Sequence, residues 1–305
     1  MKNNRRKFVQ IAGTLTAGSL LLPAISCKSD NAKKAADTTT PELKTPEVFK
    51  LDKFGIQLYS LKEDFAKNPK DVLKQVAEFG YQQVEGYEME RGLWWDMTPT
   101  DFKSYLNDIN LQMVSSHCDI HNDFEKKAEE AAQVGLAYLV CPWIGPQKSV
   151  EAWKDVTDKF NKCGQICKDA GIKFAYHNHA YSFKAFSGMI PQDFIMENTD
   201  PDLVDHEMDI YWVVTGGADP KEYLKKYANR FKLCHIKDRM ADTTEDMAST
   251  NLGTGIIDFA SILPVAAANG MKYYLAEQER YEGTTALESA ALNAKYLKAL
   301  RGKES

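Results

Sequence analysis

The sequence predicts an α/β protein that folds as a single (β/α)8 barrel, and three observations lead to this fold class. The 305 residues are 44% hydrophobic and 27% charged, which is ordinary for a globular domain with a large core. Short apolar runs alternate with longer amphipathic segments, as in parallel strands joined by helices. About eight such pairs fit into roughly 250 residues, the usual size of this barrel. No glycine-rich nucleotide loop follows the first run, which makes a doubly wound open sheet the second choice.

The expected strands are short apolar runs, and the expected helices carry apolar residues three or four positions apart. We expect strands at residues 54–59, 83–86, 112–116, 138–142, 172–177, 203–208, 231–235 and 272–277. We expect helices at residues 69–79, 100–109, 125–134, 149–170, 191–197, 220–227, 259–268 and 285–300. Three of these helices run into Gly80, Gly135 and Gly171, and glycine commonly follows the end of a helix.

The first 48 residues differ from the barrel in composition. Residues 1–27 combine a basic start, an apolar stretch and small residues before Cys27, which is the layout of an export signal. The segment RRKF resembles a twin-arginine signal, and AISC resembles a lipoprotein cleavage box. Residues 28–48 are polar and indicate a flexible linker. We therefore expect an exported protein, either periplasmic or anchored to the membrane through a lipid on Cys27, with its barrel at residues 49–305.

Charge and cysteine content argue against several classes of protein. The formal net charge is −5, and no basic cluster occurs outside the N-terminus, so nucleic acid is not an expected partner. Contact with a membrane is expected only through the lipid anchor. Five cysteines follow Cys27 without a CxxC pair, so we expect no structural zinc site and predict that most of these thiols are buried as small hydrophobic side chains. The oligomeric state is left open.

Polar and ionisable residues gather where the predicted strands end. In a (β/α)8 barrel the active site lies at the carboxyl ends of the strands. Four of the six histidines fall at this rim, namely His117, His177, His179 and His235. The other polar and aromatic residues expected there include Gln57, Tyr59, Glu85, Trp143, Asp209, Lys237, Glu277 and Glu279.

Four of these residues, His177, Asp209, His235 and Glu277, end four consecutive predicted strands. The two-residue period of a strand points all four toward the barrel interior. Two imidazoles and two carboxylates suit Mn²⁺, Co²⁺, Fe²⁺, Zn²⁺ or Mg²⁺ and leave positions for substrate oxygens. A single histidine at a strand end is more often a hydrogen-bonded structural residue, so the prediction of a divalent metal site depends on all four together.

At these residues the sequence resembles the xylose isomerase-like TIM-barrel family, and in particular its sugar phosphate isomerase/epimerase branch. The resemblance spans nearly all of residues 49–300 through GIQLYSL, YHNH, HEMDIYW, CHIKD, LGTGIIDF and LAEQE. It implies an enzyme that acts on a small carbohydrate. In the family's epimerases one metal is held by Glu, Asp, His and Glu, and Asp209, His235 and Glu277 match the last three. His177 stands where those relatives have the first glutamate.

The predicted chemistry is proton abstraction next to a carbonyl, through an enediolate. A divalent cation would act as a Lewis acid on substrate oxygens. Glu277 and His179 are the expected bases, since a carboxylate or an imidazole can take the proton and return it elsewhere. Lys237 would stabilise the developing negative charge, or else would pair with Asp238 or Glu277.

Further rim residues are expected to bind the substrate or to support the site. Glu85 and His117 are expected to contact sugar hydroxyls, with a structural role as the alternative for each. Trp212, which stands where some relatives have another histidine, is expected to stack on the sugar. Glu207 lies one inward step below Asp209 and is expected to support it.

Four functional hypotheses follow. The first is a metal-dependent sugar isomerase or epimerase, although His177 weakens the case for a symmetric two-base epimerisation. The alternative is a lyase or hydratase that eliminates the C1 substituent of 3-keto-glycosides, because some exported members of the branch resemble such enzymes. A third is a non-catalytic carbohydrate-binding lipoprotein. A nuclease similar to endonuclease IV is disfavoured by the acidic net charge.

Overall fold

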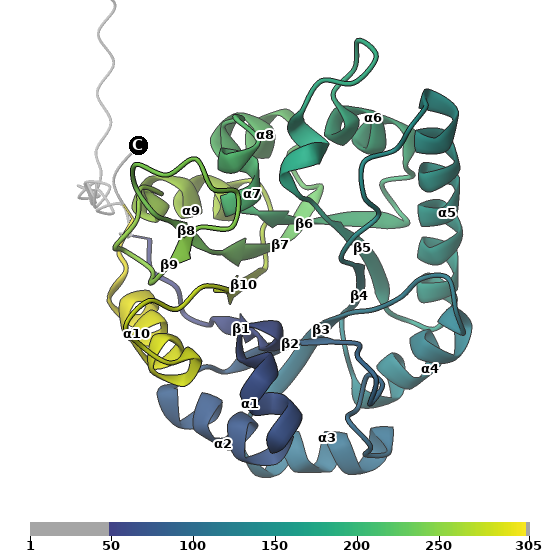
Figure 1. Ribbon diagram of the computed structural model, residues 1–305. Coiled ribbons are helices and arrows are strands. Elements are labelled where there is room, and N and C mark those ends of the chain that lie inside the picture. The colour runs from purple at the N-terminus through teal and green to yellow at the C-terminus, as the bar shows by residue number, and fades with distance from the viewer. Residues whose placement is uncertain (1–48, 303–305) are drawn as a thin grey trace, which may run out of the picture. The chain divides into compact units, whose positions relative to one another are not determined.

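A closed barrel of eight parallel strands forms the centre of the computed structural model, which describes residues 49–302 (Figure 1). Around the barrel the strands follow the order β1, β10, β7, β6, β5, β4, β3 and β2. Their bounds are β1 Gly55–Gln57, β2 Gln83–Tyr87, β3 Gln112–His117, β4 Tyr138–Cys141, β5 Lys173–His177, β6 Val204–Asp209, β7 Phe231–Ile236 and β10 Tyr273–Ala276. The predicted (β/α)8 barrel is therefore confirmed.

Helices surround the barrel on its outer side (Figure 1). The helices expected from the sequence are α2 Pro69–Phe79, α3 Pro99–Asp108, α4 Phe124–Val134, α5 Val150–Asp169, α6 Pro191–Asn198, α8 Pro220–Lys226, α9 Phe259–Ala268 and α10 Ala286–Ala299. Two short helices were not expected, namely α1 Lys62–Lys67 and α7 Ile210–Thr215. Each has only six residues and follows closely on a strand, so it is too short to show a clear helical period.

Local chemistry explains where the predicted helices begin and end. In α2 the Asn68 side chain accepts a hydrogen bond from the backbone N–H of Asp71, and Gly80 closes the helix with a left-handed φ of 94°. In α10 the side chains of Thr285 and Glu288 each accept a hydrogen bond from the other's backbone N–H, which forms a capping box.

The barrel interior below the rim is filled by apolar side chains. Ala175, Leu233 and Leu275, which lie two positions before His177, His235 and Glu277, belong to one buried cluster with Val114, Tyr138 and Val140. This layer confirms the inward face that the two-residue period predicted. This layer fills the barrel below the rim, so the polar residues above it rest on apolar side chains that exclude water.

After β7 the chain forms a separate small hairpin, with β8 at Asp238–Arg239 and β9 at Ser249–Thr250. The Asp238 carboxylate accepts backbone hydrogen bonds from Gly253, Gly255 and Ile257 at 2.9–3.1 Å. Gly255 is required there, because a Cβ would lie 2.2 Å from the carbonyl oxygen of Arg239. The motif LGTGIIDF therefore serves to fold this loop at the barrel mouth.

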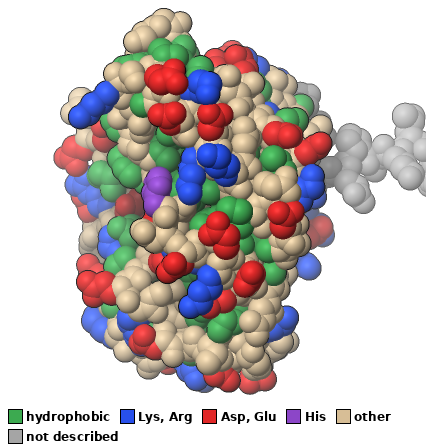
Figure 2. All heavy atoms as spheres, turned by 90° about the vertical axis from the view of Figure 1, so that its right-hand side faces the viewer, with side chains coloured by type: hydrophobic (Ala, Val, Ile, Leu, Met, Phe, Trp, Pro, Cys, Tyr) green, Lys and Arg blue, Asp and Glu red, His purple; other side chains and the backbone are tan. Residues whose placement is uncertain are grey.

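Other sequence predictions meet the structure only in part. All five cysteines of the described region are buried and unpaired, as expected. Within residues 49–302, no helix is both long and apolar enough to span a membrane. The outer face that carries α5 mixes acidic and basic side chains (Figure 2). The predicted export signal and linker lie outside the described residues and stay predictions.

Candidate active site and metal centre

The carboxyl ends of four strands bring two imidazoles and two carboxylates to one point inside the barrel rim. His177 ends β5, Asp209 ends β6, His235 lies near the end of β7, and Glu277 directly follows β10. One ligand-type atom from each side chain lies within 4.8 Å of the other three. All four residues are buried. The four residues predicted to bind a metal are thus gathered in one place.

His235 stands at the centre of this cluster. Its Nδ1 lies 3.2 Å from His177 Nε2 and 3.2 Å from Glu277 Oε2. The same nitrogen lies 3.8 Å from Asp209 Oδ2. His177 Nε2 lies 3.5 Å from that Asp209 oxygen. Two nitrogen and two oxygen donors therefore converge on one small volume.

The segment His-Asn-His at the end of β5 serves two purposes. Asn178 bonds the backbone of Asp209 twice, donating to its carbonyl oxygen at 3.1 Å and accepting from its N–H at 3.2 Å. Asp209 Oδ1 accepts a hydrogen bond from the Trp212 backbone N–H at 3.0 Å, which starts α7. Its Oδ2 is buried without a hydrogen-bond partner. Asn178 thus ties β5 to β6, while His177 faces the cluster.

The second ring nitrogen of His235 is held by Glu85. His235 Nε2 lies 2.6 Å from Glu85 Oε2, and Gln57 donates to the same oxygen at 2.8 Å. Although burial opposes ionisation, His117 and His235 lower the pKa of Glu85 to about 2. Because Nε2 faces the Glu85 carboxylate, Nδ1 is the nitrogen that His235 presents to the cluster as a possible metal ligand. Glu85 was expected to contact substrate, but it is fully buried, does not line the pocket and orients His235.

Glu207 lies deeper in the barrel and meets His117. Its Oε2 lies 2.9 Å from His117 Nε2 and 3.5 Å from His235 Nε2. Burial and the charge of Glu85 raise the pKa of Glu207 well above its ordinary value, which favours the neutral acid. A second group of ligand-type atoms within 4.8 Å shares two histidines with the first and comprises His117, His177, Glu207 and His235.

Lys237 places a buried cation beside Glu277. Its Nζ lies 3.2 Å from Glu277 Oε2 and also contacts Glu279 Oε1. The ammonium lies 5.1 Å from the ring centroids of both Tyr211 and Trp212. The aromatic faces and the two carboxylates offset much of the cost of burying the charge.

This ion pair sets the charge of Glu277. Although burial favours the neutral acid, Lys237 and His235 hold the pKa of Glu277 well below its ordinary value. Burial opposes the charge of Lys237 too, yet Glu277 and Glu279 raise its pKa. Of the two partners expected for Lys237, the structure shows Glu277. The Asp238 carboxylate instead accepts backbone hydrogen bonds from the loop that contains Gly253.

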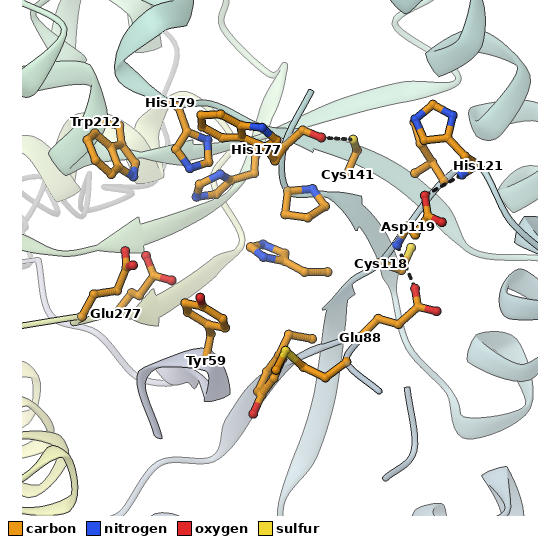
Figure 3. A pocket seen from close by; sticks show the side chains of 17 residues that line it. Tyr59, Glu88, Cys118, Asp119, His121, Cys141, His177, His179, Trp212 and Glu277 are labelled. Carbon is orange, nitrogen blue, oxygen red and sulfur yellow. Dashed lines mark hydrogen bonds between the residues drawn. The ribbon is translucent and has the colours of Figure 1, made fainter. Parts of the chain in front are cut away.

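A pocket of about 490 Å³ opens at the barrel mouth beside the cluster (Figure 3). Among the predicted site residues, those that line it are His117, His177, His179, Trp212 and Glu277. Asp209, His235 and Lys237 lie behind this lining. Within the described part of the chain, the residues that line the pocket include no lysine or arginine.

His179 lies in the pocket wall close to two indole rings, of which Figure 3 labels Trp212. Its ring centroid lies 4.5 Å from that of Trp143 and 5.3 Å from that of Trp212. Its Nδ1 has no hydrogen-bond partner. Burial and the neighbouring His177 hold the pKa of His179 well below its ordinary value, so the ring is neutral. Such an imidazole can accept and return a proton.

The cluster fits a divalent metal ion on its own chemistry. Asp209 Oδ2 is a buried carboxylate oxygen without a hydrogen-bond partner, and a bound cation would give it one ligand interaction. The other donors of the group are the two imidazoles and the Glu277 carboxylate. Mixed nitrogen and oxygen donors suit Mn²⁺, Fe²⁺, Co²⁺ or Zn²⁺. Glu85 supplies the outer carboxylate that commonly supports a metal-bound histidine.

Sequence reasoning placed some residues at the rim without giving them a role. Gln57 proves to hold Glu85, and Glu279 proves to pair with Lys237. Trp143 proves to pack against His179. Their only sequence signal was a position near the carboxyl end of a predicted strand, which does not reveal a partner on another strand.

The structure shows a (β/α)8 barrel with a buried cluster that could hold a metal ion, and the comparisons agree on the fold. A family model described as xylose isomerase-like TIM barrel matches residues 73–300. A crystal structure of a sugar phosphate isomerase/epimerase from Parabacteroides distasonis ATCC 8503 is similar, with a TM-score of 0.70 and 30% identity, over 86% of this chain and 97% of that one. The chain belongs to the xylose isomerase-like TIM-barrel family.

Two further similarities concern dehydratases and metal binding. The inosose dehydratase of Geobacillus kaustophilus is 27% identical over 232 residues, which are 63% of this chain and 73% of that protein. The chain spans only 54% of the length of an inosose dehydratase of Clostridium perfringens. The IOLI protein, solved with a bound zinc atom, has 17% identity and a TM-score of 0.66 over 81% of this chain and 98% of that one, which shows the shared fold.

Proposed function

We propose that this protein is a carbon–oxygen lyase that acts on an uncharged, polyhydroxylated cyclic ketone. It removes the proton next to the carbonyl and expels the oxygen substituent one carbon further on, as water or as an alcohol. The inosose dehydratases among its relatives support a lyase over the isomerase or epimerase that the sequence first suggested.

The observation that carries this proposal is His179, a neutral imidazole with an unpartnered nitrogen in the pocket wall. As a neutral base, His179 takes the proton from the carbon next to the carbonyl. The electron pair of that C–H bond forms the new C=C bond, and the bond to the leaving oxygen breaks. The imidazolium then returns its proton to that oxygen, so one group serves as base and acid.

The neighbouring residues prepare the substrate carbonyl for this step. His177, Asp209, His235 and Glu277 would hold a divalent cation, which when bound supplies Lewis-acid polarisation of substrate oxygens. Lys237 balances the charge of Glu277 and adds positive potential where the enolate oxygen develops. Glu85 keeps His235 turned toward the cluster.

The charge of the pocket favours an uncharged substrate. Its lining includes the carboxylates of Glu88, Asp119, Glu277 and Glu279, and no lysine or arginine from the described residues. A phosphorylated sugar would meet these carboxylates with no basic side chain in the described lining to bind its phosphate. A 3-keto-glycoside that loses its C1 substituent is an uncharged substrate of this kind. We favour it if the export signal is active.

A second candidate is an isomerase or epimerase that uses the same enolate. It is favoured by the 30% identity to the Parabacteroides distasonis structure, which is described as a sugar phosphate isomerase/epimerase. The two reactions differ in what the enolate does next, since the proton returns to carbon in one and a C–O bond breaks in the other.

Incubation of the full chain in D₂O with an inosose and with methyl 3-keto-glucoside, with and without Mn²⁺, separates these reactions. The lyase predicts an enone and released water or methanol. Deuterium on a recovered sugar of altered configuration, with no enone, would contradict it and support an epimerase. No reaction with either ketone, across the metals considered, would contradict both.

Site variants test the assignment. We expect Asp209→Asn and Glu277→Gln to lower kcat/KM at least ~100-fold, and His179→Gln to lower it by about 10²–10⁴, because each removes a ligand or the proton carrier. Glu129→Gln, at an exposed carboxylate on α4, is the matched control and should keep full activity. Full activity in an Asp209→Asn/Glu277→Gln double variant would overturn the site.

A further inference from the structure

We propose that a groove beside the pocket is a second binding subsite, which holds the leaving group of the substrate. The groove has a volume of about 330 Å³ and is lined by residues that include Ile120, His121, Ile144, Gln147, Val156 and Lys159. It accommodates a ring with an apolar face and polar edges. This inference rests on the proposed lyase function and names the class of substrate that the lyase takes.

The groove continues directly from the catalytic pocket. Ile120 and His121, in the loop after β3, line both hollows. In the loop after β4, Trp143 lines the pocket and the next residue, Ile144, lines the groove. Figure 3 shows His179 on one side of the pocket and His121 on the other. The two hollows therefore meet between these loops, and the groove leads away from the cluster toward α5.

Trp143 stands at the junction as an exposed aromatic surface. The residue is 56% exposed, which is unusual for tryptophan, yet its ring is held edge-on against two neighbours. The ring centroids lie 4.5 Å from His179 and 4.9 Å from Tyr181. A fixed aromatic ring beside the proton-transferring residue is suited to stack on a substrate ring.

Hydrogen bonds within the loop that carries Trp143 hold its shape without a ligand. Gln147 donates hydrogen bonds to the carbonyl oxygens of Ile144 and Gly145 at 2.8 and 3.1 Å. Gly145 adopts a left-handed φ of 69°, which turns the chain at this point. A preorganised loop loses little conformational entropy on binding.

The chemistry of the groove selects the occupant. Ile120, Ile144 and Val156 offer apolar contact, whereas His121 and Lys159 supply polar groups. Trp143, which packs against His179, lies between the pocket and the groove. In the proposed reaction the group attached to the leaving oxygen therefore extends past Trp143 into the groove. The favoured substrates are therefore glycosides whose aglycone is an aromatic ring or a second sugar ring.

The test compares leaving groups on one ketone. Full-chain enzyme is assayed with methyl, benzyl and glucosyl 3-keto-glucosides, since benzyl alcohol and methanol are alcohols of similar acidity. We expect kcat/KM to be at least ~10-fold higher for benzyl, for glucosyl or for both, and the two arms distinguish an aromatic from a sugar occupant. Trp143→Ala and Ala152→Gln, which fills the groove, should reduce this preference about five- to tenfold.

Two controls lie at exposed sites outside the groove and should keep the preference. Ala267→Gln on α9 repeats the Ala152→Gln change, and Leu292→Ala on α10 likewise truncates an exposed large hydrophobic side chain to alanine. Equal kcat/KM for the three leaving groups, or a preference that survives both groove variants, would overturn the subsite while leaving the lyase intact.

If no ketone reacts, the lyase fails, and calorimetric binding of benzyl glucoside decides the subsite. Binding weakened at least ~5-fold by both variants supports it, and unchanged or absent binding overturns it.

Discussion

At the scale of single residues, the site depends on how each ligand-type side chain is held by a partner that is not a ligand. Asn178 and the Trp212 N–H fix Asp209, and Glu85 fixes His235. His177 differs, because its Nδ1 is buried without a hydrogen-bond partner. His177, which stands where the resemblance to the family's epimerases implies a glutamate, therefore also has the weakest outer support of the four.

The charge at position 177 should determine how strongly the thermal stability of the protein depends on a bound metal ion. His177→Glu adds a third carboxylate beside Asp209 and Glu277, so the metal-free protein should lose stability, by about 3 kcal/mol if the new charge is uncompensated. Added Mn²⁺ should then raise the Tm more than in the parent protein, because the cation offsets the charge. Thermal unfolding in EDTA and in Mn²⁺ measures both effects.

His177→Gln is the control for this prediction, since it changes the ligand without adding charge. We expect it to unfold in EDTA at a temperature closer to that of the parent and to gain little from Mn²⁺. Equal Tm values in EDTA for the two variants would show that charge at this position does not control stability.

At the scale of elements, the long helix α5 packs closely against the chain that leads into β6. Gly164 lies on its buried face, where a Cβ would stand 2.5 Å from the backbone oxygen of Leu203. Glycine therefore allows the helix to approach the barrel. This contact matters for the site, because β5 and β6 carry His177 and Asp209.

Gly164→Ala should destabilise the protein, although alanine favours helix formation. The gain in helix propensity is about 1 kcal/mol, whereas overpacking against backbone costs about 1–3 kcal/mol. We expect a net loss of about 1 kcal/mol and a Tm lower by a few degrees, measured by circular dichroism. Lys162→Ala, on the exposed face of α5, should change stability by less than about 0.5 kcal/mol. A Gly164→Ala protein as stable as the parent would mean that α5 can move outward freely.

At the scale of the whole molecule, the candidate active site lies at one end of the barrel, and a buried carboxylate that affects stability lies near the other end. The cluster and pocket lie at the carboxyl ends of the strands, while Asp205 lies near the opposite end of β6. The Asp205 carboxylate accepts a hydrogen bond from the Tyr138 hydroxyl at 2.8 Å. Burial raises the pKa of Asp205 even though Tyr138 and Lys173 oppose the shift.

A raised carboxyl pKa predicts how stability changes with pH. Asp205 ionises more readily in the unfolded chain, so its contribution is present below its unfolded pKa and is lost as the pH rises through the folded pKa. Asp205→Asn removes this loss, and its stability relative to the parent should increase between about pH 4 and pH 7. Urea unfolding at several pH values measures the difference. Asp202→Asn, at an exposed carboxylate nearby, is the control; a difference for Asp205→Asn that falls as pH rises would contradict the sign.

The alternation of short apolar runs with amphipathic segments favoured a barrel over an open sheet and located its strands and helices, because period and turn residues are local properties. The same local period predicted that His177, Asp209, His235 and Glu277 share one face, which the structure shows.

Only the tertiary structure decided which atoms meet. The pairing of Glu85 with His235 joins residues 150 positions apart, and the junction of pocket and groove joins the loops after β3 and β4. Such contacts depend on barrel closure and on side-chain rotamers, which no local pattern encodes. For that reason the sequence by itself indicated a metal-type site and named His179 as a candidate base, whereas the roles of Gln57, Glu85 and Trp143 depend on the folded molecule.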